Sequence, residues 1–274
     1  MKLIHALIGG TIGVLLLIES CDNATKKSER SSSSVATPII SYSVKRTLPH
    51  DTLSFTEGLL VHKGQLFEST GSPDELLQAR SLFGTVDTTT GKIDPKVELD
   101  RRKYFGEGIV ILNGKLYQLT YKNKVGFIYD ANTYRKIGQF DYKNPEGWGL
   151  TTDGRYLIMS DGTSTLTYLS ADSLRPVKVL KVSENGAAVD KLNELEFIGG
   201  HIYANIWSTN TLIKIDTSRG DVVGRMDLSS LQSDAQTKYA KSLEMNGIAY
   251  DTRNNKVYVT GKMWPSIYEI EFAH

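Results

Sequence analysis

The chain has 274 residues, a single Cys and a formal net charge of +1, from 32 Lys and Arg against 31 Asp and Glu. This near-neutral balance gives no electrostatic attraction for phosphate backbones and so argues against nucleic-acid binding. One Cys excludes an intrachain disulfide framework and a zinc site built from cysteines. Hydrophobic residues make up 40% of the chain, which is enough apolar surface for a folded core.

The N-terminal segment has the composition of an export signal. Lys2 supplies a positive charge, and residues 6–18 form a 13-residue apolar run that is short for a membrane span. A small residue, Ser20, directly precedes Cys21, as in a bacterial lipobox. The pattern predicts a signal peptide over residues 1–20 and a lipid on Cys21. An ordinary signal peptide with an incidental cysteine, or an uncleaved anchor, are the alternatives.

Residues 22–37 are polar and include four consecutive serines, a composition typical of a flexible tether. We therefore expect a lipid-anchored linker over residues 21–37 and a folded domain over residues 38–274. The expected location is the bacterial cell envelope, where an exported lipoprotein faces the periplasm or the cell surface.

From Ile39 onward, short runs of Val, Ile, Tyr, Phe and Thr alternate with Gly, Asn and Asp, which is typical of an all-β domain. Two strand-like runs joined by a tight turn recur along the chain. The turn residues lie at 62–64, 112–114, 152–154, 198–200 and 253–255.

Each of these units begins with a polar or aromatic residue at an equivalent position. These lead positions are Glu57, Glu107, Trp148, Asn193 and Asn246, spaced 50, 41, 45 and 53 residues apart. A period of about 40–50 residues built from strands predicts a β-propeller, here with five blades. The fifth unit has room for only three strands, so we expect residues 40–44 to pair with it and close the ring. A short helix is expected at residues 239–243.

In a propeller, the residues that lead the inner strands meet at one mouth of the central channel, so the five lead residues predict a site. Each also has a structural explanation, since a lone Glu is usually a solvated turn residue, Trp packs between blades and Asn forms turns. The sequence has no G-x-S-x-G elbow, no G-x-G-x-x-G loop and no pair of His at i and i+4. Carboxylate acid–base chemistry without a redox cofactor is therefore favoured.

Seven segments in the same order carry a family resemblance. They are Phe55–Leu59, Phe105–Gly108, Glu146–Gly154, Leu192–Phe197, Ala204–Trp207, Met245–Asp251 and Val259–Pro265. Together they resemble the glutamine cyclotransferases of the plant and bacterial type over roughly residues 54–272. The resemblance implies a five-bladed propeller closed by an N-terminal strand, and an enzyme that converts N-terminal Gln into pyroglutamate and ammonia. It implies no metal or other cofactor in the reaction.

The resemblance also implies roles for single residues. Glu107, in F-G-E-G, matches the proton-transfer carboxylate. The matching substrate-pocket positions are Phe55, Glu57, Tyr121, Trp148, Asn193, Trp207 and Lys262. Two of them depart from the family pattern, since many members have Gln where this chain has Glu57, and plant members have Trp where it has Tyr121. These departures bear on specificity and rate, not on the reaction class.

The reaction suits these residue types. The α-amine attacks its own side-chain amide, so the enzyme mainly orients two tethered groups. One Glu can take a proton from the amine and deliver it to the leaving nitrogen, while Lys262 or Asn193 would stabilise the oxyanion. The expected partners are peptides or proteins with N-terminal Gln, and we expect a monomer that meets the membrane only through its lipid.

Two other functions fit parts of the pattern. An inactive propeller that holds protein termini or glycans would need no proton-transfer residue, yet Glu107 is present. A metal-dependent propeller lactonase or related hydrolase would use several Glu, Asp, Asn and His around a divalent ion. Glu57, Glu107, Asn193 and Asn246 partly imitate such a site, but the sequence places no His near them.

Overall fold

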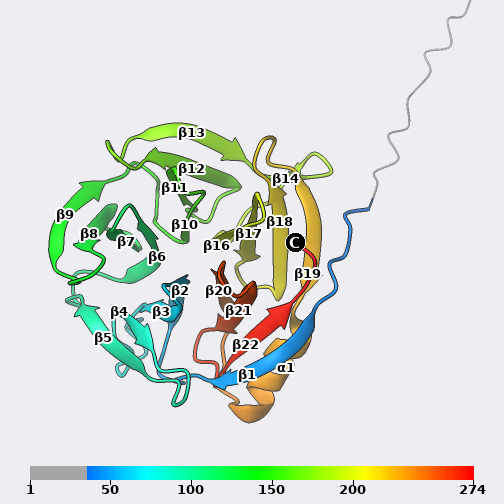
Figure 1. Ribbon diagram of the computed structural model, residues 1–274, viewed down its shortest axis with the longest axis horizontal. Coiled ribbons are helices and arrows are strands. Elements are labelled where there is room, and N and C mark those ends of the chain that lie inside the picture. The colour runs from blue at the N-terminus through cyan, green and yellow to red at the C-terminus, as the bar shows by residue number, and fades with distance from the viewer. Residues whose placement is uncertain (1–35) are drawn as a thin grey trace, which may run out of the picture. The chain divides into compact units, whose positions relative to one another are not determined.

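Five four-stranded antiparallel sheets are arranged as blades around a central axis in the computed structural model, which describes residues 36–274 (Figure 1). The predicted five-bladed β-propeller is confirmed. Blades 1 to 4 each use four consecutive strands, with the first strand innermost. These strands are β2 (Thr56–His62), β3 (Gln65–Thr70), β4 (Leu82–Val86) and β5 (Ile93–Glu98) in blade 1; β6 (Gly106–Leu112), β7 (Lys115–Thr120), β8 (Val125–Asp130) and β9 (Lys136–Asp141) in blade 2; β10 (Leu150–Thr152), β11 (Tyr156–Met159), β12 (Thr165–Ser170) and β13 (Pro176–Lys181) in blade 3; and β16 (Leu192–Ile198), β17 (His201–Ile206), β18 (Thr211–Asp216) and β19 (Val222–Asp227) in blade 4.

Blade 5 joins the two ends of the propeller. Its strands are β20 (Met245–Asp251), β21 (Lys256–Gly261), β22 (Ser266–Glu271) and, outermost, β1 (Ser43–Pro49). β1 runs antiparallel to β22, from Ser43 opposite Glu271 to Pro49 opposite Ser266. An N-terminal strand therefore closes the ring and covers the edge of blade 5, as predicted.

The expected position of this strand is wrong by a few residues. Residues 40–44 were expected to form it, whereas Ile39 and Ile40 attach to Arg225 of β19 in blade 4, and pairing with blade 5 begins at Ser43. The prediction rested on the strand-like residues 40–44. The outermost strand that forms is mostly exposed, with only Leu48 buried. A strand with so little buried surface leaves almost no hydrophobic signal in the sequence.

The helix is also displaced from its expected place. Residues 239–243 were expected to be helical, but α1 spans Ser229–Lys238, between β19 and β20. Asp227 accepts the backbone N–H of Ser229 at the start of α1, 2.9 Å away. Only Leu231 and Ala235 of α1 are buried. Two apolar positions four residues apart are too few to produce a visible helical period in the sequence.

The apolar core is divided among the blade interfaces. Five buried clusters each join neighbouring blades, and the cluster between blades 4 and 5 also includes α1. A small hairpin of β14 (Ser183–Glu184) and β15 (Ala187–Ala188) extends from blade 3 toward blade 4. The hydrophobic packing lies between the blades, and polar side chains lie along the central axis of the ring.

The inner strands bulge where the lead residues sit. In four of the five inner strands the pairing with the next strand shifts at the lead residue, namely at Glu57, Glu107, Asn193 and Asn246. In blade 3, β10 pairs with β11 without a shift and begins after Trp148. A bulge leaves a residue unpaired and redirects its side chain. The glycine after the lead residue lets the blades touch, since a Cβ on Gly108 would lie 2.5 Å from the backbone nitrogen of Leu150. The Glu-Gly pairs of blades 1 and 2 thus combine a redirected side chain with a close strand contact.

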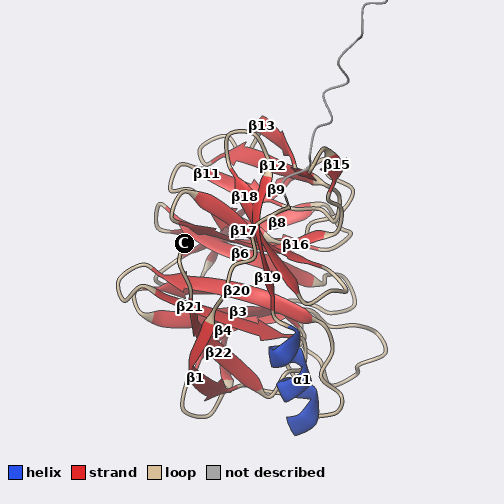
Figure 2. Cartoon of the chain, turned by 90° about the vertical axis from the view of Figure 1, so that its right-hand side faces the viewer, coloured by secondary structure: helices blue, strands red, loops and turns tan. Residues whose placement is uncertain are grey.

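Figure 2 shows α1 beside the strands of blade 5; it is the single helix among residues 36–274. No helix in this part of the chain combines the length and apolarity needed to cross a membrane. The predicted signal peptide, Cys21 and most of the predicted linker lie outside the described residues.

Candidate active site

A cavity of about 270 Å³ opens where the inner strands begin. It brings together all eight residues that the sequence placed in the catalytic pocket. The residues around it are Phe55, Glu57, Pro73, Phe105, Glu107, Tyr121, Trp148, Asn193, Trp207, Glu244 and Lys262. They come from all five blades, so the site exists only in the closed ring.

A buried cation is held between two carboxylates at the side of the cavity. The Lys262 ammonium lies 2.9 Å from Glu57 Oε1 and 3.3 Å from Glu244 Oε1, and 4.4 Å from the centre of the Phe55 ring. Burial alone would lower the pKa of Lys262, but Glu57, Glu244 and Glu107 outweigh it and the pKa is raised. Lys262 is therefore a fixed positive charge.

Glu57 is held from two sides. Besides Lys262, the Nδ2 group of Asn246 donates to Glu57 Oε2 at 3.0 Å. Burial raises the pKa of Glu57 to about 7, and Lys262 opposes this rise. Asn246 was expected at the channel mouth, but it does not line the cavity. It lies behind Glu57, where it also donates to the Thr56 carbonyl at 2.9 Å.

Glu107 faces the cavity, and its carboxyl group has no hydrogen-bonding partner among residues 36–274. Its side chain is almost completely buried, and no described residue donates to its carboxyl group; only its backbone carbonyl accepts, from Ser69 Oγ at 2.6 Å. Burial raises the pKa of Glu107 well above its ordinary value, the charge of Glu57 adds to this rise, and Lys262 opposes it. A carboxyl group with a raised pKa and free lone pairs can both give and take a proton.

Two tryptophans form one aromatic wall. The rings of Trp148 and Trp207 meet edge to face, with centroids 5.8 Å apart. Each indole N–H donates to a carboxylate, Trp148 to Glu146 at 2.8 Å and Trp207 to Glu244 at 3.0 Å. These bonds fix the orientation of both rings, which offer apolar surface to an aliphatic side chain.

A second group of aromatic rings lies in blades 1 and 2. Phe105 meets Phe55 edge to face, with ring centroids 6.1 Å apart, and it meets Tyr121 at a tilt, with centroids 5.7 Å apart. Asn193 adds a buried amide to the cavity, and its Oδ1 atom has no partner among the described residues. The cavity thus combines apolar faces with a few polar groups that are free to bind a small polar ligand.

The sequence analysis missed Pro73, Phe105 and Glu244. A repeat pattern could have found the last two. They stand two residues before a lead residue, as Phe55 does. The five positions of this second ring are Phe55, Phe105, Glu146, Lys191 and Glu244. Three of them line the cavity, Glu146 binds the Trp148 indole, and the Lys191 ammonium lies 5.4 Å from the Trp207 ring. Pro73 lies in a loop outside the repeat and left no such signal.

The fold and the cavity define a class of protein, a five-bladed propeller with a cavity lined by carboxylates and aromatic rings where its inner strands begin. The family model described as glutamine cyclotransferase matches residues 14–272. The chain is 35% identical over 261 residues to the glutaminyl-peptide cyclotransferase of Arabidopsis thaliana, covering 94% of this chain and 80% of that relative. The crystal structure of Myxococcus xanthus glutaminyl cyclase matches with a TM-score of 0.77 at 31% identity, covering 86% of this chain and 98% of that one.

The chain therefore belongs to the glutamine cyclotransferase family, and it is an acyltransferase enzyme, a glutaminyl-peptide cyclotransferase. Within residues 36–274, no group of three or more His, Cys, Asp or Glu side chains is arranged to hold a metal ion.

Proposed function

We propose that this chain closes the N-terminal Gln of peptides and proteins into pyroglutamate, with Glu107 moving the proton. The observation that carries the proposal is the Glu107 carboxyl group, which faces the cavity with a raised pKa and no hydrogen-bond donor from the described residues. The reaction needs one group that accepts a proton from the α-amine and then delivers it to the leaving nitrogen.

In the proposed reaction, the α-amine nitrogen attacks the carbonyl carbon of the substrate's own side-chain amide and forms a five-membered ring. Glu107 takes the proton that the attacking nitrogen loses. It delivers this proton to the amide nitrogen, the bond from the carbonyl carbon to that nitrogen breaks, and ammonia leaves. The enzyme mainly has to hold two tethered groups in a reactive orientation.

Lys262 supports the negative oxygen of the tetrahedral intermediate. An ammonium has three N–H donors, and Glu57 and Glu244 accept two of them. The remaining donor is available to the oxyanion. A fixed charge in a buried site stabilises developing charge better than a mobile one in water.

The carboxylates of the cavity favour a cationic N-terminus. Glu57, Glu107 and Glu244 line the cavity with a single buried ammonium, Lys262. A free α-amine has a pKa of about 7.7–8.0, so much of the substrate arrives protonated near neutral pH. The acidic surroundings would bind this ammonium, which loses one proton to solvent before its nitrogen attacks. Trp148 and Trp207 would contact the aliphatic part of Gln.

The test is a mass measurement. We expect the protein to remove ammonia from a peptide that begins with Gln and to leave unchanged the same peptide with an acetylated α-amine. A folded protein that binds the first peptide without converting it would support the inactive binding module. Conversion that a chelator abolishes and a divalent metal restores would support the metal-dependent alternative.

We also propose that the enzyme is a monomer, exported from a bacterial cell and held in the cell envelope by a lipid on Cys21 after removal of residues 1–20. The support is the apolar run followed by Ser20 and Cys21. Intact-mass measurement of membrane-extracted protein should find a mature chain that begins with a lipidated cysteine. A soluble mature form with a free Cys21 thiol would contradict this proposal.

A further inference from the structure

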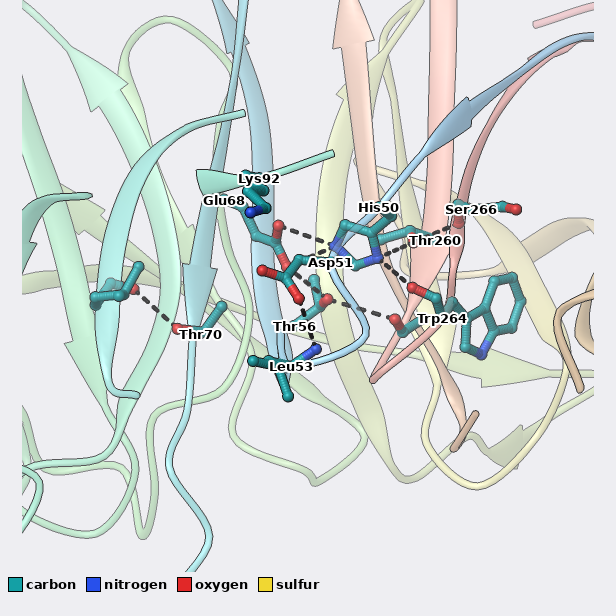
Figure 3. A network of polar contacts seen from close by, with 12 residues as sticks. His50, Asp51, Leu53, Thr56, Glu68, Thr70, Lys92, Thr260, Trp264 and Ser266 are labelled. Atoms are coloured by element: carbon teal, nitrogen blue, oxygen red, sulfur yellow. Dashed lines mark hydrogen bonds and ion pairs between the residues drawn. The ribbon is translucent and has the colours of Figure 1, made fainter. Parts of the chain in front are cut away.

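A buried histidine, His50, lies at the seam where the ring closes (Figure 3). It is not among the residues that line the cavity. His50 directly follows β1, and its side chain is completely shielded from solvent. Its Nδ1 atom lies 2.7 Å from the Trp264 carbonyl oxygen of blade 5. Its Nε2 atom lies 3.0 and 3.1 Å from the two carboxylate oxygens of Glu68, on β3 of blade 1.

Both partners of this ring require a donor. A carbonyl oxygen only accepts, and so does a carboxylate in its ionised form, so opposite an ionised Glu68 both ring nitrogens carry a proton. The imidazole is then a cation paired with Glu68. Burial is the largest single influence on His50 and would lower its pKa. The charge and hydrogen bond of Glu68, the bond to the Trp264 carbonyl and the charge of Asp51 together exceed it, so the pKa of His50 is raised. On the blade 5 side, His50 meets the Trp264 carbonyl and the Thr260 hydroxyl, which carry no charge.

One end of this pair contacts the segment that carries Lys262. Trp264 is two residues beyond Lys262, and the His50 backbone N–H donates to the next carbonyl, that of Pro265, at 3.0 Å. Met263, which lies between Lys262 and Trp264, has a φ of 59°, in the left-handed region that a side chain disfavours. Such a conformation persists only where neighbouring contacts hold it. The bonds from His50 hold the end of this turn.

The other end of the pair controls the strand that carries Glu57. Thr56 donates its hydroxyl to Glu68 Oε1 at 2.7 Å, and Thr56 directly precedes Glu57. The chain of contacts therefore runs from the turn of Lys262 through His50 and Glu68 to the strand of Glu57. It connects, from behind, the two side chains that meet at 2.9 Å in the cavity wall.

We propose that the His50–Glu68 pair is a positioning device, which holds Lys262 in register with Glu57 although neither member of the pair lines the cavity. The inference rests on the proposed function, because it assumes that Lys262 acts on the reacting amide. Loss of the pair would leave the substrate pocket in place while moving the ammonium. Turnover would then fall more than substrate binding.

The first test replaces His50 by Gln, whose amide cannot donate at two opposite ends as the imidazolium does. A displacement of about 1 Å can cost about 100-fold in rate, so we expect kcat to fall by roughly 10- to 100-fold with a KM within a few-fold of wild type. His62→Gln is the matched control, since His62 lies at the far end of β2, away from the cavity, and should keep the wild-type kcat.

The second test uses pH and does not depend on the folding of the His50 variant. In the wild type, the imidazolium is complete below about pH 6.5 and is lost as pH rises through its raised pKa. One ring nitrogen of the neutral imidazole then turns a lone pair toward the Trp264 carbonyl or Glu68, and that hydrogen bond is lost. Because Lys262 is then held less firmly, kcat should decline reversibly at alkaline pH. In Glu68→Gln the side-chain amide can rotate to accept from the charged ring or donate to the neutral one. This variant should fold, turn over substrate at neutral pH and lose the alkaline decline.

Three results would overturn the inference. The first is a folded His50→Gln enzyme with kcat within about threefold of wild type and only a lower melting temperature. The second is a His50→Gln enzyme in which KM rises by the same factor as kcat falls. The third is a Glu68→Gln enzyme that keeps the alkaline decline in kcat of the wild type. Wild-type turnover is measured first in the same assay. A wild type that releases no ammonia would count against the proposed function, whereas an active wild type with any of these three results would count only against the positioning role.

Discussion

Glu107 at the cavity and Glu194 in the channel are both buried glutamates in bulges of inner strands, but their surroundings differ. Glu194 accepts the backbone N–H of Ile248 at 2.8 Å and that of Leu59 at 3.5 Å, so it joins blades 4, 5 and 1. Glu107 has no such donor. Burial raises the pKa of both carboxyl groups well above the ordinary value.

A raised pKa can reflect burial alone or a catalytic role, and these glutamates distinguish the two. Glu196, two residues farther along β16, has its pKa raised to about 8 by burial, yet it too accepts a backbone N–H, from Tyr250 at 2.8 Å. A raised pKa therefore reports burial in all these residues and does not by itself identify the catalytic one. The free lone pairs and the cavity distinguish Glu107. The channel glutamates serve to connect inner strands.

The largest expected effect is on Glu107. Glu107→Gln keeps the size of the side chain but cannot accept the proton, so kcat should fall by about 10²- to 10⁴-fold. The melting temperature should change little, because no described residue donates a hydrogen bond to this carboxyl group. Ammonia release and circular dichroism together check the prediction. Unfolding of the variant would favour a structural role instead.

Glu194→Gln should show the opposite pattern. Gln can accept only at one end, so its NH₂ group would face the backbone N–H of Ile248 or Leu59, both of which Glu194 now satisfies. Leaving a buried donor without an acceptor costs about 1–3 kcal/mol. The unfolding midpoint in urea should fall accordingly, with kcat within a few-fold of wild type. A large loss of kcat at full stability would place Glu194 in the catalytic step and break the comparison.

Glu57 should affect the pH dependence of stability. Its pKa is raised to about 7 in the folded protein, from 4.5. Between these values the folded state binds more protons than the unfolded state, so stability falls as pH rises through this window. One pKa unit corresponds to about 1.4 kcal/mol, so the change reaches about 3 kcal/mol. Glu57→Gln should flatten this slope and keep most of the activity, as expected from the Gln that many relatives have there. The free energy of unfolding is measured in urea at several pH values across this window. If it falls with pH as steeply in Glu57→Gln as in the wild type, the raised pKa does not belong to Glu57.

The smallest expected effect concerns the aromatic wall. Trp207→Phe removes the N–H that Glu244 accepts at 3.0 Å but keeps an aromatic face. A hydrogen bond contributes about 0.5–1.5 kcal/mol, so kcat/KM should fall by no more than about tenfold, mostly through KM. Steady-state kinetics on a Gln-initiated peptide would measure this change. A fall in kcat as large as that of Glu107→Gln would mean that Trp207 takes part in the proton transfer.

The sequence predicted the five blades because the two-strand unit repeats and each copy has its own turn. It did not predict where the closing strand begins, because β1 is largely exposed and its partner β22 is more than two hundred residues away in the chain. Helix α1 was misplaced for a similar reason, since it buries only Leu231 and Ala235.

For the site, the repeat identified one residue in each blade, and the family resemblance added Phe55, Tyr121, Trp207 and Lys262. Neither pointed to Pro73, Phe105 or Glu244, which also line the cavity. Neither indicated that Asn246 stands behind Glu57 or that Lys262 is shared between Glu57 and Glu244. Side chains from different blades meet through bulges and turns, whose geometry the pattern of residue types does not specify. The absence of donors at Glu107 likewise became visible only in three dimensions.

The most direct test of the proton-transfer role is chemical rescue. Glu107→Ala removes the carboxyl group and leaves space at the cavity, and formate, a small carboxylic acid, is then added to the assay. We expect that ammonia release from a Gln-initiated peptide, almost abolished in the variant, rises with formate concentration, whereas formate does not stimulate Glu194→Ala. A Glu107→Ala enzyme that still binds the peptide but that formate cannot restore, or one that is as active as the wild type, would show that Glu107 does not transfer the proton.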